Sequence, residues 1–258
     1  MTRQNMIYPN LEFNKWIPCM NKEISSEDSM LDGNYDHYFN VGYSALDSIE
    51  KVLHSAKIGE TKKILDMPCG YGRVMRTIRA AFPESQITGC DLDKKGVDFC
   101  SKTFNAIPVY SKELPKDIQI NEKFDLIWCG SLLTHLDGPN WDPFLTFFIE
   151  HLNNKGVLVF TTHGRLDAKW ISDGLNNIEK EHLFFGLLEA QYSRLIKKFN
   201  NDGFGYENYP NQSNYGVSLS KPSWVLMQLE KHPDIRIISY TECGWDDHQD
   251  VIGIIKMD

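Results

Sequence analysis

A glycine-bearing loop follows a short apolar run in the first third of the chain. The run KILDM at 63–67 contains the acid Asp66 and leads into PCGYGR at 68–73. Glycines there let the backbone approach a ligand closely, and the N-terminus of a following helix favours partial negative charge or hydroxyl groups. The loop departs from the dinucleotide pattern GxGxxG, because its third glycine position is Met75. A second acid, Asp91, ends the next strand-like run and suits ribose hydroxyls. We therefore predict a ribose-bearing ligand.

Histidines and acids also occur at two later points of the chain. His163 ends a strand-like run, and WDDHQD at 245–250 lies between the last two strand-like runs. Asp247 and His248 can form a pair, since a carboxylate fixes the tautomer of an imidazole and raises its basicity. We predict His163 or His248 as the proton acceptor of a reaction, with Asp247 as the orienting acid. A solvated hairpin with an acidic turn is the alternative for this segment.

Metal binding is a further alternative for the same histidines. His163, His248 and nearby acids offer ligand atoms, but no spacing in the sequence requires a metal ion, and we predict none. The six cysteines form no CxxC pair and no metal-ligand spacing. They are typical of reduced thiols in a cytoplasmic protein.

Apolar periodicity predicts the elements that position these residues. Strand-like runs alternate with helical patterns, which is typical of a parallel sheet covered by helices on both faces, an α/β fold. The carboxyl ends of such strands meet at the ligand-binding edge of the sheet. The predicted strands are 63–67, 86–93, 106–110, 124–130 and 156–164, and the predicted helices are 41–56, 73–82, 94–104 and 141–152.

The alternation of strands and helices stops at 165–220, where we predict one helix at about 179–199 and a loop at 205–216. A helix at 222–232 and strands at 235–242 and 250–257 then close the chain. We predict one domain, 1–258, with an aromatic N-terminal arm (1–40), a core (41–164 and 221–258) and an insertion (165–220). The aromatic N-terminal stretch, including Tyr38 and Tyr43, either closes over a ligand or wraps the sheet.

Composition narrows the class of protein. The chain has 258 residues, of which 41% are hydrophobic and 24% charged, as in a globular protein. Its 27 basic and 35 acidic residues give a net charge of −8, which argues against a large phosphate-binding surface. The longest nearly apolar stretch, LFFGLLEA at 183–190, is far shorter than the roughly 20 residues that span a bilayer. We expect a cytoplasmic protein without a membrane span or signal peptide.

With these motifs in order, the chain from about 63 to 164 resembles a class I S-adenosylmethionine-dependent methyltransferase. The family's acid-x-G-x-G-x-G loop corresponds to Asp66-Met-Pro68-Cys-Gly70-Tyr-Gly72, with Pro68 in place of the first glycine. FDLIWCGSLLTHLD at 124–137 matches the fourth-strand motif, and LNNKGVLVF at 152–160 matches the turn and fifth strand. The resemblance implies a Rossmann-like seven-stranded sheet with a closing hairpin. An N-terminal extension and a cap-like insertion before the last helix would complete it.

The resemblance also implies the cofactor S-adenosyl-L-methionine, with S-adenosyl-L-homocysteine as product. The acid that the family uses for the adenosine ribose corresponds to Asp91, with Leu92 beside the adenine and Ser111 as an adenine-contacting polar residue. The full set of cofactor-binding residues that it implies is Asp66, Pro68, Gly70, Gly72, Arg73, Asp91, Leu92, Ser111, Cys129 and Gly130.

Acceptor choice is expected to depend on the strand ends and on the insertion. His135 either binds the acceptor or packs as a buried structural residue. Carboxylates accept hydrogen bonds from hydroxyls while an indole covers an apolar sugar face, so Trp245 and Asp246 are predicted to bind the acceptor, together with His135 and Tyr215. The insertion offers further rings and amides that either line a polar pocket or shape turns. These are Tyr206, Asn208, Tyr209, Asn211, Asn214 and Tyr215.

The absence of a nucleic-acid methyltransferase motif bears on the nature of the acceptor. Nucleic-acid N-methyltransferases of this fold commonly carry Asn/Asp-Pro-Pro-aromatic after the fourth strand, where this chain has Cys129-Gly130-Ser131-Leu132. The chain also resembles a bacterial group associated with surface-polysaccharide and glycosyltransferase gene clusters. We therefore expect O-methylation of a sugar hydroxyl in a glycan or its precursor, by a monomer or homodimer, alone or alongside a glycosyltransferase. The alternatives are a non-sugar metabolite as acceptor, or a non-catalytic cofactor-binding partner of a glycosyltransferase.

Overall fold

A seven-stranded sheet forms the centre of the molecule. The computed structural model describes residues 16–176 and 183–258. Strand order is β3-β2-β1-β4-β5-β9-β8, with β9 antiparallel to both of its neighbours and the other strands parallel. This is the predicted Rossmann-like sheet with its closing hairpin. The strands are β1 (Lys63–Asp66), β2 (Gln86–Asp91), β3 (Ile107–Tyr110), β4 (Phe124–Cys129), β5 (Leu152–Thr162), β8 (Ile235–Trp245) and β9 (Gln249–Lys256).

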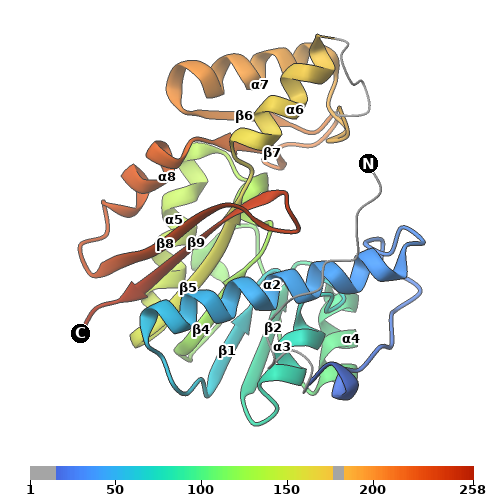
Figure 1. Ribbon diagram of the computed structural model, residues 1–258, viewed down its shortest axis with the longest axis vertical. Helices are drawn as coiled ribbons and strands as arrows, with labels where there is room; N and C mark the ends of the chain where they lie inside the picture. The colour runs from blue at the N-terminus through green and yellow to red at the C-terminus, as the bar shows by residue number, and fades with distance from the viewer. Residues whose placement is uncertain (1–15, 177–182) are drawn as a thin grey trace.

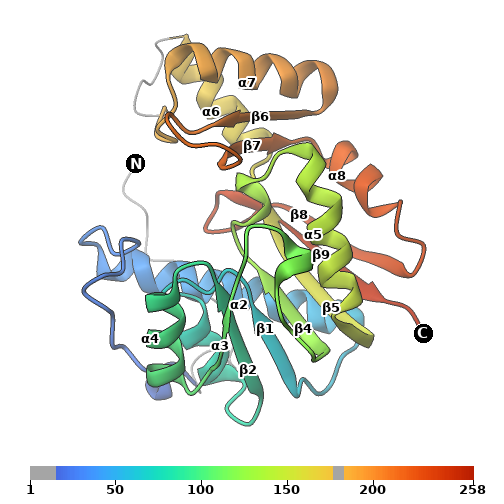
Figure 2. The same ribbon diagram turned by 180° about the vertical axis from the view of Figure 1, so that it is seen from behind.

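Helices cover both faces of the sheet because its inner strands are apolar on both sides. On β4, Leu126 and Trp128 belong to one buried core and Ile127 and Cys129 to the other, as side-chain alternation along a strand requires. The first core is completed by α2 (Tyr35–Ala56), α3 (Met75–Ala81) and α4 (Lys94–Phe104), and the second by α5 (Gly138–Glu150) and α8 (Pro222–Leu229). The two faces can be followed in Figure 1 and Figure 2.

Residues 165–176 and 183–220 form a cap at one end of the sheet, above β5 and α5 in Figure 1. The cap consists of α6 (Arg165–Leu175), α7 (Glu189–Asp202) and a two-stranded antiparallel sheet, β6 (Phe204–Asn208) with β7 (Gly216–Ser220). Buried side chains from α6, α7 and β7, among them Ile171, Leu195 and Leu219, give it a small core of its own.

Two predictions for this region were wrong, and one helix was missed. The helix expected at about 179–199 begins only at Glu189, and the apolar run from Leu183 to Leu188 is irregular; residues 177–182 lie outside the described residues. The stretch 205–216, expected as a loop, contains most of β6 and the start of β7. Helix α6 was not predicted at all. Its first turn is closed by the Asp167 side chain, which accepts a hydrogen bond from the Gly164 backbone N–H at 2.9 Å.

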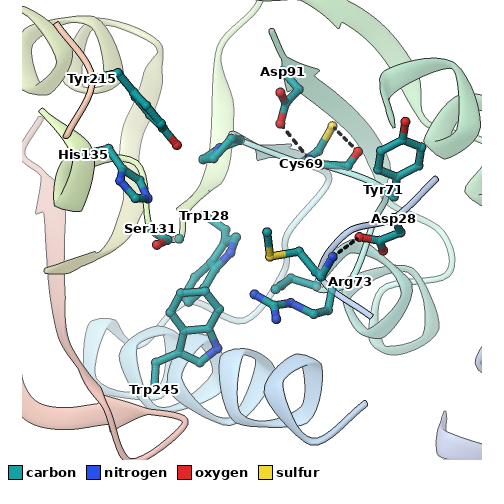
Figure 3. A pocket seen from close by; sticks show the side chains of 15 residues that line it. Asp28, Cys69, Tyr71, Arg73, Asp91, Trp128, Ser131, His135, Tyr215 and Trp245 are labelled. Atoms are coloured by element: carbon teal, nitrogen blue, oxygen red, sulfur yellow. Dashed lines mark hydrogen bonds between the residues drawn. The ribbon is translucent and has the colours of Figure 1, made fainter. Parts of the chain in front are cut away.

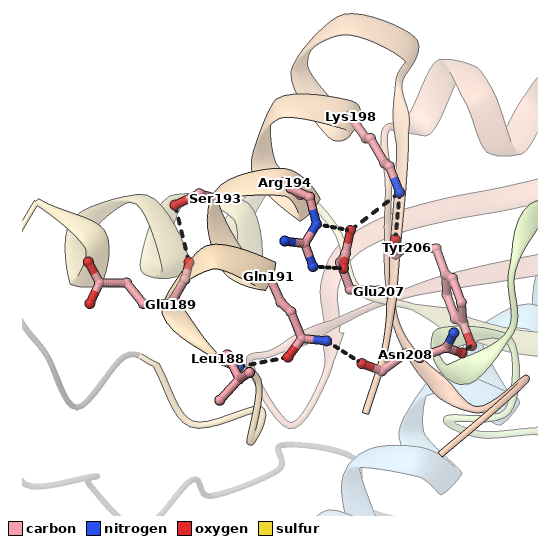
Figure 4. Close-up of polar contacts among 9 residues, drawn as sticks. All are labelled: Leu188, Glu189, Gln191, Ser193, Arg194, Lys198, Tyr206, Glu207 and Asn208. Carbon is pink, nitrogen blue, oxygen red and sulfur yellow. Dashed lines mark hydrogen bonds and ion pairs between the residues drawn. The ribbon is translucent and has the colours of Figure 1, made fainter. Parts of the chain in front are cut away.

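Polar side chains of the cap hold α7 against β6, as Figure 4 shows. Arg194 binds the buried Glu207 carboxylate through two nitrogens at 3.1 and 2.7 Å, and Lys198 adds a contact at 3.3 Å. The Tyr206 hydroxyl donates to the Asn208 side chain at 2.7 Å. Tyr206 and Asn208 therefore serve the cap itself, and neither lines the cavity described below.

The closing hairpin places its turn at the ligand-binding edge. Because β8 runs parallel to the first five strands, the turn between β8 and β9 opens at the same edge as their carboxyl ends. This confirms the orientation on which the prediction for residues 245–250 depended. Within the described residues, no helix combines the length and apolar character that crossing a bilayer requires.

Candidate active site

A cavity of about 290 Å³ opens at the carboxyl ends of β1, β2 and β4, where ligands bind in open α/β sheets. Figure 3 shows its side chains. Its wall comes from the N-terminal arm, the glycine loop, the end of β4, the cap and the closing hairpin. The lining residues are Asp28, Met30, Pro68, Cys69, Gly70, Tyr71, Arg73, Val74, Asp91, Trp128, Gly130, Ser131, His135, Tyr215 and Trp245.

The glycine loop and Asp91 hold one another in place. The Gly70 N–H donates to the Asp91 carboxylate at 2.8 Å, and the Asp93 N–H donates to its other oxygen at 2.8 Å. Gly70 has φ +49°, a left-handed conformation that favours glycine, and α4 packs so closely that a Cβ on Gly96 would lie 2.5 Å from the Gly70 carbonyl oxygen. Asp91 is thereby fixed at the cavity wall with its carboxylate beside the loop.

Asp66 and Arg73 are two buried ionisable side chains at the glycine-loop end of the cavity. Asp66 is 1% exposed, and neither of its carboxyl oxygens has a hydrogen-bond partner among the described residues. Burial, together with the nearby Asp91 carboxylate, raises the pKa of Asp66 well above its ordinary value. The Arg73 guanidinium points into the cavity (Figure 3), where burial lowers its pKa and no described residue forms a hydrogen bond or ion pair with it. A ligand with one ammonium and one carboxylate group would offer a partner to each of these two side chains.

Five residues of the predicted cofactor set do not line this cavity: the buried Asp66, Gly72, Leu92, Ser111 and Cys129. The Cys129 side chain faces the core beneath α5, because alternation along β4 turns Trp128 toward the cavity instead. Gly72 has a packing role, since a Cβ there would lie 2.4 Å from the Phe104 ring. Leu92 is 60% exposed and Ser111 follows β3, so their contacts to adenine stay predictions.

His135, Ser131 and Tyr215 form the wall opposite the glycine loop. The His135 Nδ1 lies 2.8 Å from the Gly216 carbonyl oxygen, and its ring stacks on Tyr215 with centroids 4.8 Å apart. Because a carbonyl only accepts, Nδ1 carries the proton and Nε2 keeps a lone pair. Burial lowers the pKa of His135, which keeps the ring neutral. His135 thus has a free basic nitrogen at the cavity wall.

The two acids in the turn of the closing hairpin, Asp246 and Asp247, do not line the cavity. The Trp245 indole lines the cavity against Trp128, with its N–H donated to the Val41 carbonyl at 3.0 Å, and its ring is buried. Asp246 turns toward α2, where its N–H binds Ser44 at 2.8 Å. Asp246 and Asp247 have φ of +56° and +53°, so both shape the turn. Trp245 thus lines the cavity and Asp246 does not, and an acceptor role for either residue stays a prediction.

His163 and His248 lie together outside the cavity lining. His163 is buried at the end of β5, and its ring stacks on His248 at 5.4 Å between centroids. The partner of His248 is Asp167 of α6, at 2.5 Å from Nε2, whereas Asp247 is exposed at the tip of the turn. The predicted Asp247–His248 pair is thus wrong. It failed because α6, which carries Asp167, was not predicted.

Several cavity residues were missed from sequence. Ser131 has φ +60°; its N–H binds Thr161 at 2.8 Å, and its hydroxyl accepts from Gln249 at 3.1 Å. Asp28 and Met30 reach the cavity from the N-terminal arm. The signal for Trp128 and Ser131 was their place within the fourth-strand motif, whereas the irregular arm carries no periodic pattern that would mark Asp28 or Met30.

Tyr209, Asn211 and Asn214 of the insertion do not line the cavity, whereas Tyr215 does. The Tyr209 hydroxyl lies 3.4 Å from His135 Nδ1, behind the cavity wall. Asn211 and Asn214 have φ of +65° and +62°, which asparagine tolerates better than most residues, so they shape the β6–β7 connection. Of the six rings and amides proposed for a polar pocket, Tyr215 lines the cavity.

Comparison with known proteins agrees with this geometry. A family model described as "Methyltransferase domain" matches residues 65–158. A malonyl-[acyl-carrier protein] O-methyltransferase from Bacillus cereus is 26% identical over 135 residues, covering 51% of this chain and 49% of the relative. The chain thus spans about half the length of that relative.

Solved structures share the fold. A S-adenosylmethionine-dependent methyltransferase from Clostridium acetobutylicum superposes with a TM-score of 0.55 at 15% identity, covering 84% of this chain and 92% of the other. CalS10 from Micromonospora echinaspora, described as an amino pentose methyltransferase and solved with its cofactor bound, gives 0.54 at 12% identity with the same coverage. The domain match and the shared fold agree: the chain contains a methyltransferase domain and has the fold of S-adenosylmethionine-dependent methyltransferases.

Proposed function

We propose that this methyltransferase transfers a methyl group to a hydroxyl of a sugar, within a bacterial glycan or a glycan precursor. The proposal is carried by one observation. The described cavity has two ends. One end is charged, with Arg73 and Asp91 in its lining and the buried Asp66 beside it. The other is an uncharged wall, the acceptor wall, formed by Ser131, His135 and Tyr215.

The charged end fits the cofactor. The unpartnered Asp66 oxygens would take the ammonium of the methionine moiety, Arg73 its carboxylate, and Asp91 the ribose hydroxyls. S-adenosylmethionine supplies a methyl group on a sulfonium, which a nucleophile displaces in line. The protein's task is then to hold the acceptor oxygen and remove its proton.

His135 is the group that can remove this proton. Its Nδ1–H is committed to the Gly216 carbonyl, so Nε2 is the basic atom, and the buried ring stays neutral. Tyr215 packs flat on the ring and fixes its plane. The catalytic role proposed from sequence for His163 or His248 thus passes to His135, since neither of them lines the cavity.

A sugar fits the uncharged wall because sugars present both hydroxyls and an apolar C–H face. Tyr215 is 44% exposed and offers a ring face, while Ser131 and His135 offer hydrogen-bonding groups. Arg73, the basic side chain of the lining, lies at the cofactor end, so the wall provides no cation for the phosphates of a nucleic-acid acceptor. The proposal includes a glycan precursor as acceptor and a glycosyltransferase as partner.

An acceptor panel tests the proposal. The protein is incubated with methyl-labelled S-adenosylmethionine and with free sugars, nucleotide sugars, oligosaccharides, carboxylic acids, amines and phenols. We expect label in a sugar product as a methyl ether, which resists alkali, whereas a methyl ester does not. Label entering non-sugar products alone would contradict the sugar acceptor. Tight cofactor binding without S-adenosylhomocysteine formation, for every acceptor, would indicate a non-catalytic binding partner.

A further inference from the structure

Three side chains converge behind the acceptor wall, outside the cavity lining. His163 comes from the end of β5, Asp167 from the first turn of α6, and His248 from the turn between β8 and β9. One nitrogen of each imidazole and one Asp167 oxygen all lie within 4.8 Å of one another. His163 and Asp167 are buried, and the His248 side chain is 23% exposed. Residues far apart in sequence thus bring three ligand-type atoms into one small volume.

The surroundings fix these groups in the forms that bind a cation. The His163 Nδ1 lies 3.2 Å from the Ser218 carbonyl oxygen, so Nδ1 carries the proton and Nε2 a lone pair. The Asp167 Oδ2 accepts the Gly164 N–H, which leaves Oδ1 toward His248. Metal-binding imidazoles and carboxylates are held in this way by backbone groups behind them.

The charge balance of the cluster also favours a cation. Asp167 is fully buried, and among residues 16–176 and 183–258 the structure gives it His248 as its ion-pair partner, with no lysine or arginine. A second acid, Asp250, lies close by: a Cβ on Gly164 would be 2.3 Å from its Oδ2. Trp170, Phe184 and Phe185 lie around the His248 ring, with centroids 5.4 to 6.4 Å away. Such an apolar cover strengthens the attraction between a cation and the buried carboxylate.

We propose that His163, Asp167 and His248 bind one divalent transition-metal ion of the zinc type. Two imidazoles and one carboxylate suit such an ion better than Mg²⁺, which prefers oxygen ligands alone. Three protein ligands leave a fourth position open for water or a ligand oxygen. Binding displaces the proton that His248 Nε2 shares with Asp167 Oδ1, and this proton leaves to solvent.

The ion would tie the cap and the closing hairpin to the end of β5. It would also stand directly behind the acceptor wall, because the His163 ring packs edge-on against His135 with centroids 6.5 Å apart. The proposal does not depend on the sugar acceptor, since metal binding is measured without cofactor or acceptor.

The test is a titration of chelator-treated, full-length protein with Zn²⁺ by isothermal calorimetry, alongside thermal unfolding with and without Zn²⁺. We expect one ion per chain and a higher unfolding temperature, and Mg²⁺ should not compete. Asp167→Asn and His248→Gln should weaken Zn²⁺ binding at least tenfold. His54→Gln, which changes an exposed histidine of α2, should bind as the unchanged protein does. Absence of Zn²⁺ binding to the unchanged protein, or equal binding by all variants, would overturn the site.

Cobalt keeps the proposal testable even where a variant fails to fold. Co²⁺ bound by two imidazoles and a carboxylate gives visible d–d absorption, which Zn²⁺ should abolish by displacing the ion. We expect this spectrum from the unchanged protein with one equivalent of Co²⁺. A featureless spectrum, or Co²⁺ that Zn²⁺ does not displace, would contradict the three-ligand site.

Discussion

The imidazole of His135 lies at the cavity wall, and within residues 16–176 and 183–258 its Nε2 has no hydrogen-bond partner. Replacing it, as in His135→Gln, removes the base while keeping a polar side chain. We expect kcat to fall by about 10²- to 10⁴-fold, the usual contribution of a general base, with little change in cofactor affinity. His151→Gln is the matched control, because His151 also donates Nδ1–H to a carbonyl, that of Phe147 at 2.7 Å, but lies outside the cavity.

The pH dependence of kcat gives His135 a second signature. Burial lowers its pKa below the ordinary 6.5, and only the unprotonated ring accepts a proton. The rate should therefore be flat at neutral pH and fall as the pH drops through this lowered value. His135→Gln should lack that acidic limb. An identical limb in the variant would show that another group titrates.

The buried Asp66 side chain lowers the free energy of unfolding of the unliganded protein at neutral pH. Because burial raises its pKa, the folded state holds this proton more tightly than the unfolded chain does. The stabilising contribution is present below the ordinary 3.8 and is lost as the pH rises through the raised value. Asp66→Asn should thus stabilise the unliganded protein at pH 7; a gain of about 1 kcal/mol would raise Tm by about 2–4 °C.

The same variant should bind S-adenosylmethionine more weakly, and calorimetry together with thermal unfolding checks both effects. Asp98→Asn, at an exposed acid on α4, should change neither quantity. A variant that loses stability and keeps its affinity would contradict the assignment of Asp66 to the cofactor's ammonium.

At the scale of elements, the cofactor end depends on how closely α4 approaches the glycine loop. A Cβ at Gly96 would lie 2.5 Å from the Gly70 carbonyl oxygen, and this backbone cannot yield without moving the loop. Overpacking of this kind costs about 1–3 kcal/mol. Gly96→Ala should therefore weaken cofactor binding about tenfold, since 1.4 kcal/mol corresponds to that factor.

Gly59→Ala provides the comparison for this substitution. Its Cβ would meet nothing within 4 Å, so calorimetry should give the affinity of the unchanged protein. Equal affinities for the Gly96 and Gly59 variants would mean that the loop and α4 do not set the cofactor site.

The sequence predicted elements well where periodicity and burial agree. The parallel strands are apolar on both faces and bounded by glycine or acidic turns, so β1 to β5 and α4 lie close to where the pattern places them. The cap is different, because it is a small layer with its own core. The apolar run from Leu183 to Leu188 suggests a helix by composition, yet it is the irregular approach to α7.

Site residues were predictable where they belong to a local motif. Asp91 ends a predicted strand and Gly70 lies in the loop after another, and both line the cavity. From sequence, His135 could either bind the acceptor or pack as a buried structural residue. Its tautomer depends on the carbonyl of Gly216, 81 residues away in sequence. Likewise, Asp167 could be connected to His248 only after α6 and the hairpin had been placed in space. Contacts of this kind carry no periodic signal.

At the scale of the whole molecule, we propose that different parts of the chain hold the cofactor and the acceptor. The cap supplies Tyr215 and the Gly216 carbonyl that fixes His135, whereas the glycine loop and the strand ends would hold the cofactor. Leu195→Ala, in the buried core of the cap, should cost about 2–5 kcal/mol of unfolding free energy. It should also raise the KM for the acceptor while cofactor affinity stays unchanged.

Leu229→Ala is the matched change on the other side of the molecule, since Leu229 of α8 is 1% exposed in the core beneath α5. A similar loss of unfolding free energy is expected there, without the rise in acceptor KM. Equal KM values for the two variants, measured at a temperature where both are folded, would contradict the division of labour between cap and core.

The central claim is that a sugar hydroxyl loses its proton to His135 as it receives the methyl group. Single-turnover reactions with methyl-labelled S-adenosylmethionine and the best sugar from the panel, run with the unchanged protein and with His135→Gln, measure this directly. The account predicts an alkali-stable methyl ether on the sugar, formed at least about a hundredfold more slowly by the variant at equal cofactor occupancy. Equal rates of ether formation, or label that never enters a sugar, would contradict it.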